Sequence, residues 1–121
     1  DAICATKAAI KEGIVPGGGI ALLNATKVLD TSISGEKILQ EAVKAPYKTI
    51  LHNAGLPIVD PIRKGMGVNV VTGNMVNMIK AGIIDPLLVT KSALKNAASV
   101  ATTILSTDCV INNIRIDESS R

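Results

Sequence analysis

The sequence predicts a mainly α fold, a small helical bundle with one or two short β-strands. Apolar residues recur at spacings of three and four positions over much of the 121-residue chain, as expected of amphipathic helices. Ala, Ile, Val and Leu must fill the interior, because Tyr47 is the only aromatic residue. A chain of this length is expected to build one compact domain with its own core.

Two helices are expected in the first part of the chain. The first, over residues 1–12, carries Ile3 and Ile10 on one face, and Gly13 would end it. Residues 14–16 are expected to form a short extended link that leads into the run Gly17-Gly18-Gly19. The second helix is expected over residues 18–29, and a polar loop over residues 30–34 should follow.

A longer helix is expected over residues 35–53, with Pro46 producing a kink or a break. The positions expected to share its apolar stripe are Leu39, Val43, Pro46, Ile50 and Ala54. After it we expect one or two helical turns within 56–64, a short strand or hairpin arm over 66–72, and a short helix over 74–80. The last helix should begin at Asp85-Pro86 and end near Leu105, followed by a closing strand around 109–114.

Composition and charge argue against several classes of function. The hydrophobic content of 47% argues against disorder, and no apolar run approaches the ~18 residues of a membrane span. The net charge of +3 comes from lysines spread along the chain, and aromatic stacking platforms are lacking, so no nucleic-acid partner is expected. Cys4 and Cys109 are expected to be reduced, buried thiols, and no metal site is predicted.

Asp85 is the first candidate for a functional side chain. An aspartate before proline is a good N-cap, because its carboxylate accepts a backbone N–H of the first helical turn while proline has no N–H to lose. The alternative is that a carboxylate oxygen also accepts hydrogen bonds from a ribose hydroxyl, as in many nucleotide sites. The two interpretations are compatible, since a carboxylate offers about four lone-pair sites.

The remaining candidates have an ordinary structural interpretation beside a functional one. The run Gly17-Gly18-Gly19 before a helix could be a tight turn, or it could let the backbone approach a ligand. Asp1 could simply begin a helix, where a carboxylate favours the helix dipole. Asn69 could serve a turn, or its amide could face an adenine edge. Neither a P-loop nor a G-x-G-x-x-G pattern is present.

Two long blocks of the sequence favour the functional interpretations. Residues 1–23 resemble, almost residue for residue, the signature block of the Hsp60/GroEL-type (group I) chaperonins. Residues 77–86 and 89–101 form a second similar block, and Ala45-Pro46 and Asn53-Ala54-Gly55 between them also fit. The resemblance covers nearly the whole chain, and both blocks are highly specific to that family.

The resemblance implies that residues 1–116 are the C-terminal portion of the equatorial, ATP-binding domain, with 117–121 as a flexible tail. Asp1 would be the catalytic aspartate that positions the water attacking the γ-phosphate. The residues implied to bind the adenosine part of ATP are Gly17, Gly18, Asn69, Val70, Val71, Ile83 and Asp85. In the intact subunit ATP would act with Mg²⁺ and K⁺.

The same resemblance implies the partners of the intact subunit. These are a homo-oligomeric ring, expected to be a heptamer, unfolded protein clients and a small co-chaperonin, in the cytoplasm or an organellar matrix. Val70 and Val71 depart from the family, which has smaller side chains there. The phosphate-binding segment and the hinge and apical domains would lie upstream of Asp1, so this chain is expected to be a processed or excised piece without ATPase activity of its own.

A different class of function is also open from the sequence. The chain could be a non-catalytic helical interaction module that self-associates, or binds a partner, through apolar faces that the rest of the subunit would otherwise cover.

Overall fold

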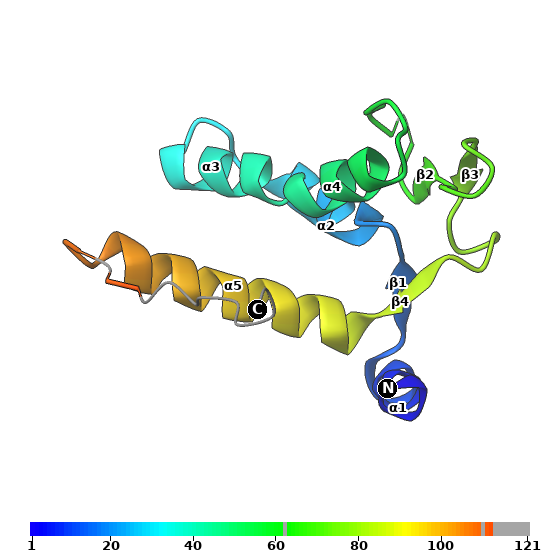
Figure 1. Cartoon of the computed structure of the whole chain (residues 1–121), viewed down its shortest axis with the longest axis horizontal. Coiled ribbons are helices and arrows are strands. Elements are labelled where there is room, and N and C mark those ends of the chain that lie inside the picture. Colours follow the sequence, from blue (N-terminus) through cyan, green and yellow to red (C-terminus); the bar gives the residue numbers. More distant parts are fainter. Residues whose placement is uncertain (62, 110, 113–121) are drawn as a thin grey trace, which may run out of the picture. The chain divides into compact units, whose positions relative to one another are not determined.

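The computed structural model describes residues 1–61, 63–109 and 111–112, and within them the predicted mainly α fold with short strands is confirmed (Figure 1). The chain divides into two compact units, residues 1–91 and 92–121, with the boundary inside the last helix. The helical segments are α1 (Ala2–Glu12), α2 (Ile20–Ala25), the 3₁₀ helix η1 (Thr26–Val28), α3 (Ser34–Ala42), α4 (Ala45–Asn53) and α5 (Leu87–Leu105). The strands are β1 (Ile14–Pro16), β2 (Met66–Val68), β3 (Met75–Asn77) and β4 (Ile84–Pro86).

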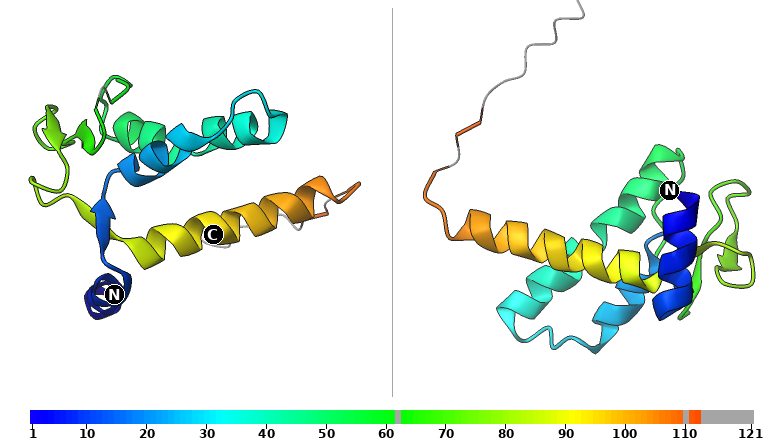
Figure 2. Two further views of the ribbon diagram at one scale, coloured as in Figure 1. Left: turned by 180° about the vertical axis from the view of Figure 1, so that it is seen from behind. Right: turned by 90° about the horizontal axis from the view of Figure 1, so that it is seen from below.

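Strands β1 and β4 form a two-stranded antiparallel ribbon in the first unit. Val15 lies opposite Asp85, and the backbone N–H of Leu87 donates to the carbonyl of Gly13 at 3.0 Å. Gly13 ends α1 as predicted, with a φ of 88° that favours glycine. The chain therefore turns sharply from α1 into the ribbon, and the left view of Figure 2 shows α1 leading into β1 and β4 leading into α5.

An ion pair joins the same two segments by their side chains. The Lys91 ammonium lies 2.5 Å from the Glu12 carboxylate, so the last turn of α1 is tied to the start of α5. Both partners are partly exposed, and such pairs contribute at most about 1 kcal/mol to stability. The ribbon's backbone hydrogen bonds therefore hold the two segments together more than this pair does.

Strands β2 and β3 form the second ribbon, a hairpin in which Gly67 lies opposite Val76. The predicted strand or hairpin arm over 66–72 is thus confirmed for residues 66–68. The helix predicted over 74–80 is wrong, because residues 75–77 are β3 and residues 78–82 form turns. In so short a segment the spacing of apolar residues does not distinguish a helix from a strand. Here the pairing with β2 determines that residues 75–77 form a strand.

The core of the first unit is small and lies where α2, α4 and the hairpin meet. Its buried residues are Ile20, Tyr47, Leu51 and Met78, with Leu23, Leu56, Val68, Val76 and Ile83 packed against them. A Cβ on Gly67 would lie 2.6 Å from Cγ1 of Ile20, so the hairpin approaches α2 as closely as a glycine allows. Backbone contact of this kind compensates for a core in which Tyr47 is the only aromatic side chain.

The predicted break near Pro46 is confirmed, but of the predicted apolar stripe only Val43 is buried, and Leu39, Pro46, Ile50 and Ala54 are exposed. Helix α3 ends at Ala42 and α4 begins at Ala45, with Pro46 in the first turn of α4, where a missing N–H has no cost. Val43, Tyr47 and Leu51 are the buried positions, whereas Ile50 is 37% exposed. Because the break re-sets the helix phase, a stripe extrapolated straight through the proline falls on the wrong face of α4.

Several other expectations are corrected among the described residues. Residues 56–61 and 63–64 contain no helical turn, and α5 begins at Leu87 after a strand that includes Asp85. Cys4 and Cys109 are free thiols as predicted, but both are exposed. Residues 109 and 111–112 are not in a strand, and the rest of the predicted closing strand and the 117–121 tail lie outside the described residues.

The second unit begins within α5, and its described helical part ends at Leu105. The side-chain hydroxyls of Ser99, Thr102 and Thr103 each donate to the backbone carbonyl four residues earlier in the helix. Leu94 is half-buried, and the other described side chains of this unit are exposed, including Val100 and Ile104. Within the described part of the chain no helix is long and apolar enough to cross a membrane, and no three His, Cys, Asp or Glu side chains are grouped so that they could bind a metal ion.

Tyr47 gives a testable consequence of this packing. Its hydroxyl donates to the Val59 carbonyl, and its side chain is 3% exposed. We predict that Tyr47→Phe lowers the free energy of unfolding by about 1 kcal/mol at neutral pH, measured by urea denaturation. An unchanged midpoint and slope would contradict this role of the hydroxyl.

The same residue predicts an alkaline loss of stability. Burial, with the nearby Asp60 carboxylate, raises the pKa of Tyr47 above its ordinary value of 10.0, so the folded state favours the neutral phenol. This contribution to stability is complete below the ordinary pKa and is lost as the pH rises through the higher folded value. Since Tyr47 is the only tyrosine, phenolate absorbance should give a midpoint above 10.0 that falls on unfolding, and Tyr47→Phe should lose less stability than the wild type at alkaline pH.

Candidate functional site

The start of the glycine run lies directly against the strand that carries Asp85. The backbone N–H of Gly17 donates to the carbonyl of Ile83 at 2.9 Å, and the strand pairs Pro16–Ile84 and Val15–Asp85 follow it along the ribbon. A Cβ on Gly17 would lie 3.2 Å from the carbonyl carbon and oxygen of Ile83, so the backbones are in close contact. The structure therefore brings three predicted site residues together: Gly17, Ile83 and Asp85.

Asp85 does not cap α5, which corrects the N-cap prediction. It lies in the middle of β4, two residues before the helix begins at Leu87. Its side chain is exposed, and among the described residues its carboxylate accepts no hydrogen bond from the first turn of α5. The oxygens that a cap would occupy are thus available to a ligand hydroxyl.

The other two glycines of the run have a structural role that is visible in the packing. Gly18 and Gly19 have φ values of 67° and 79°, which side chains rarely adopt. A Cβ on Gly18 would lie 2.8 Å from Cε of Met78, and one on Gly19 would lie 2.8 Å from the backbone nitrogen of Tyr47. The tight-turn interpretation of the run is therefore confirmed: the positive φ favours glycine at both positions, and at Gly19 a side chain would also collide with the backbone of Tyr47.

Asn69 and the two valines form the turn of the β2–β3 hairpin. The Asn69 side-chain oxygen accepts the N–H of Val71 at 3.0 Å, and its backbone carbonyl accepts the N–H of Gly73 at 2.7 Å. Asn69 therefore serves a turn, and the amide nitrogen of its side chain remains able to donate elsewhere. Val70 is 43% exposed and Val71 is 90% exposed. Their assignment to an adenine pocket stays a prediction.

Asp1 lies at the opposite end of α1 from the β1–β4 ribbon. It occupies the N-cap position without a side-chain capping bond, and it is exposed. A helix rises about 1.5 Å per residue, so α1 carries Asp1 roughly 18 Å along its axis from Gly13. Hydrogen bonds and strand pairs of the described residues connect Gly17, Ile83 and Asp85, but they do not connect these residues to Asp1. The catalytic role of Asp1 stays a prediction.

The structure also contains a hollow that the sequence did not predict. It has a volume of about 240 Å³ and is lined by Leu23, Thr26, Lys27, Gln40, Lys44, Tyr47, Lys48, Asp60 and Pro61. No predicted site residue lies in its lining. The i, i+4 spacing of Lys44 and Lys48 beside the only tyrosine was the available signal, but the contribution of Lys27 and Asp60 depends on packing between distant segments.

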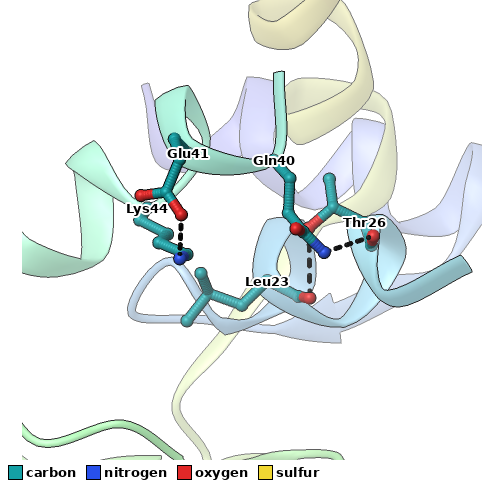
Figure 3. A network of polar contacts seen from close by, with 5 residues as sticks. All are labelled: Leu23, Thr26, Gln40, Glu41 and Lys44. Carbon is teal, nitrogen blue, oxygen red and sulfur yellow. Dashed lines mark hydrogen bonds and ion pairs between the residues drawn. The ribbon is translucent and has the colours of Figure 1, made fainter. Parts of the chain in front are cut away.

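A polar network organises one side of this hollow (Figure 3). The Gln40 side-chain amide donates to the Thr26 carbonyl at 3.3 Å, and the Thr26 hydroxyl lies 3.3 Å from the Leu23 carbonyl. The Lys44 ammonium lies 2.6 Å from the Glu41 carboxylate, and this contact lowers the pKa of Glu41. The network joins α3 to α2 and η1 and keeps the polar groups at defined positions.

Comparison with known proteins identifies the class. Residues 1–115 match the TCP-1/cpn60 chaperonin family, so the chain belongs to that family. A solved structure, the crystal structure of a group III chaperonin in the open state, is similar with a TM-score of 0.76 and 27% sequence identity. The match covers 86% of this chain and 25% of that one, so this chain spans about a quarter of that chaperonin's length.

Gly18 separates a packing role from a ligand-binding role. We predict that Gly18→Ala lowers the free energy of unfolding by about 1–2 kcal/mol, because alanine would need a positive φ and would crowd Met78. Gly35→Ala is the matched control. Gly35 lies in helix α3, and nothing lies within 4 Å of a Cβ at this position. Alanine there should raise the free energy of unfolding by about 0.5–1 kcal/mol.

Urea denaturation of the two variants measures both changes. A Gly18→Ala variant as stable as the wild type would contradict the packing role. If the prediction holds, a loss of ligand binding in that variant is not by itself evidence that Gly18 contacts the ligand.

Proposed function

We propose that this chain is the C-terminal part of the ATP-binding equatorial domain of a group I (Hsp60/GroEL-type) chaperonin subunit, which assists protein folding. It would supply the residues that contact the adenosine part of ATP, and its helices would contact neighbouring subunits in the chaperonin ring. The observation that carries the proposal is the contact of Gly17 with Ile83 beside the Val15–Asp85 pair, within a chain of the chaperonin family. The group I assignment rests on the sequence blocks at 1–23 and 77–101.

Several described residues carry groups that would suit the adenosine part of a nucleotide. Asp85 has an exposed carboxylate that could accept two ribose hydroxyls, and Ile83 offers an apolar surface beside it. The Asn69 side-chain nitrogen could donate to an adenine edge, with Val70 and Val71 next to it in the same turn. Gly17 and Gly18 let the backbone come close to the sugar. When bound, ATP would supply the free energy that shifts the ring between its states.

The other parts of the proposal concern the intact subunit. It would form a homo-oligomeric ring, with a heptamer expected for group I, and would act on unfolded clients with a small co-chaperonin. Mg²⁺ and K⁺ would accompany ATP there, and the subunit would work in the cytoplasm or an organellar matrix. Asp1 would orient the attacking water, which is a positioning role that needs the rest of the subunit.

A second candidate function has an observation of its own. Ile3 and Ile10 of α1 are 72% and 81% exposed, and Val100 and Ile104 of α5 are 60% and 55% exposed. As an isolated polypeptide, the chain would then act as a non-catalytic helical module that self-associates through these faces. Gel filtration over a range of concentrations tests this: a monomer at every concentration would argue against it.

Asp85 provides the sharpest test of the nucleotide site. In a full-length subunit that contains this chain, Asp85→Ala should weaken ATP binding about 10- to 100-fold, since charge-assisted hydrogen bonds contribute about 1.5–3 kcal/mol. The rate at saturating ATP should change much less, because the ribose only orients the nucleotide. Asp108→Ala, which removes another exposed aspartate, should leave calorimetrically measured affinity unchanged. Equal affinities for both variants would contradict the proposal.

Asp1 should show the opposite pattern. In the full-length subunit, Asp1→Ala should reduce the rate of ATP hydrolysis by at least about 100-fold while ATP affinity changes little, because the residue acts on the water. The isolated chain should hydrolyse no ATP at all. Hydrolysis by the isolated chain that Asp1→Ala abolishes would show that the missing part of the subunit is not required.

A further inference from the structure

The hollow between α2, η1, α4 and the segment at residues 60–61 lies wholly within the first unit. Its floor is apolar: the Tyr47 side chain is 3% exposed, and Leu23 and Pro61 are half-buried beside it. A volume of about 240 Å³ is slightly below the usual range for small-molecule sites, which begins at about 300 Å³. The hollow therefore has room for only a small organic molecule, such as a single apolar ring with one polar group.

Its rim is cationic. Lys27 comes from η1, Lys44 is the N-cap residue of α4, and Lys48 lies one turn further on in that helix. Asp60 is the only carboxylate among the described residues of the lining. Lys44 is paired with Glu41, but the ion pairs of the described residues include neither Lys27 nor Lys48. Lys48 also acts on the Glu41 carboxylate and helps to lower its pKa. The three lysines of the lining thus exceed Asp60 and Glu41 by one charge, and this excess favours an anionic group at the rim.

Part of the rim is also held in place before any ligand arrives. Glu41 fixes the Lys44 ammonium, and the Gln40 amide is fixed by the Thr26 carbonyl, as Figure 3 shows. The Tyr47 hydroxyl is bonded to the Val59 carbonyl, and this bond holds the segment that carries Asp60 against α4. These contacts hold the walls of the hollow in place, whereas Lys27 and Lys48 are exposed and would lose side-chain freedom on binding an anion.

We propose that this hollow binds a small organic phosphate, with the apolar body on Tyr47 and Leu23 and the phosphate between Lys27 and Lys48. The site is separate from the proposed nucleotide site, because its lining contains none of the residues predicted to contact ATP. Asp60 weakens binding because its carboxylate repels the phosphate. Removing the charge of Lys48 should therefore weaken binding, whereas removing the charge of Asp60 should strengthen it.

Cyclohexyl phosphate is a suitable probe, because it does not absorb where tyrosine does. Tyr47 is the only aromatic residue of the chain and lines the hollow, so its fluorescence reports binding at this place. In low salt we expect a saturable fluorescence change that weakens as salt is added. Cyclohexanol, which lacks the charge, and inorganic phosphate, which lacks the apolar body, should both bind more weakly.

Three variants distinguish specific binding in the hollow from nonspecific electrostatic attraction to the protein surface. Lys48→Gln should weaken binding of cyclohexyl phosphate about fivefold, and Asp60→Asn should strengthen it about fivefold, as expected for single exposed charges. Lys80→Gln removes an exposed lysine outside the lining and should change nothing. Unfolding cannot imitate the gain in Asp60→Asn.

Four results would overturn the proposal. They are the absence of a saturable change, equal binding of cyclohexanol or inorganic phosphate, an Asp60→Asn variant that binds no tighter than the wild type, and a Lys80→Gln variant that weakens binding as much as Lys48→Gln. An Asp85→Asn variant should bind the probe as the wild type does, so failure of this site and failure of the nucleotide site are told apart.

Discussion

The arrangement of the first unit depends on the backbone pairing of two segments about 70 positions apart. The run of hydrogen bonds begins where Leu87 donates to Gly13, continues through the β1–β4 pairs, and ends where Gly17 donates to Ile83. Closing so long a loop costs conformational entropy, and only contacts made after closure offset it. The Lys91–Glu12 pair and the packing of Gly17 on Ile83 are such contacts, so the ribbon and its flanks stabilise each other.

Glycine is the second constraint, since a core without Phe or Trp needs close backbone contact. Gly18 and Gly19 let the bend pass over Met78 and Tyr47, and Gly67 lets the hairpin approach Ile20. Together these positions hold α2, α4 and the hairpin around Met78. The glycine run is thus part of the core, and any nucleotide contact would use a backbone already held in place by packing. Preorganisation of this kind lowers the cost of binding.

The sequence predicted what local chemistry determines. Gly13 ends α1, Pro46 breaks the helix between α3 and α4, and the strand at 66–68 lies within the predicted range. Its errors arise where a distant partner decides the outcome. Residues 75–77 form a strand because they pair with 66–68, and the buried face of α4 contains Tyr47 and Leu51 because the break re-sets the phase.

The candidate site shows the same division. The glycine run and Asp85 were found from sequence, but their proximity is a consequence of strand pairing that no local pattern contains. The hollow was missed for that reason, since Lys27, Lys48 and Asp60 come from three separate segments. The roles of Asp1, Asn69 and the valines came from the family resemblance, and local physics alone would have assigned them to a helix start and a turn.

The correction at Asp85 strengthens the argument for a ligand-binding carboxylate. An N-cap aspartate gives one oxygen to a backbone N–H of the helix, and a ligand would have to share what remains. In β4 the side chain alternates away from the ladder, so the backbone satisfies its hydrogen bonds with β1 while the carboxylate stays exposed. Strand pairing fixes the backbone of Asp85 close to the glycine bend, and the exposed carboxylate, which is not shared with a helix N-terminus, keeps the freedom to accept two hydroxyls.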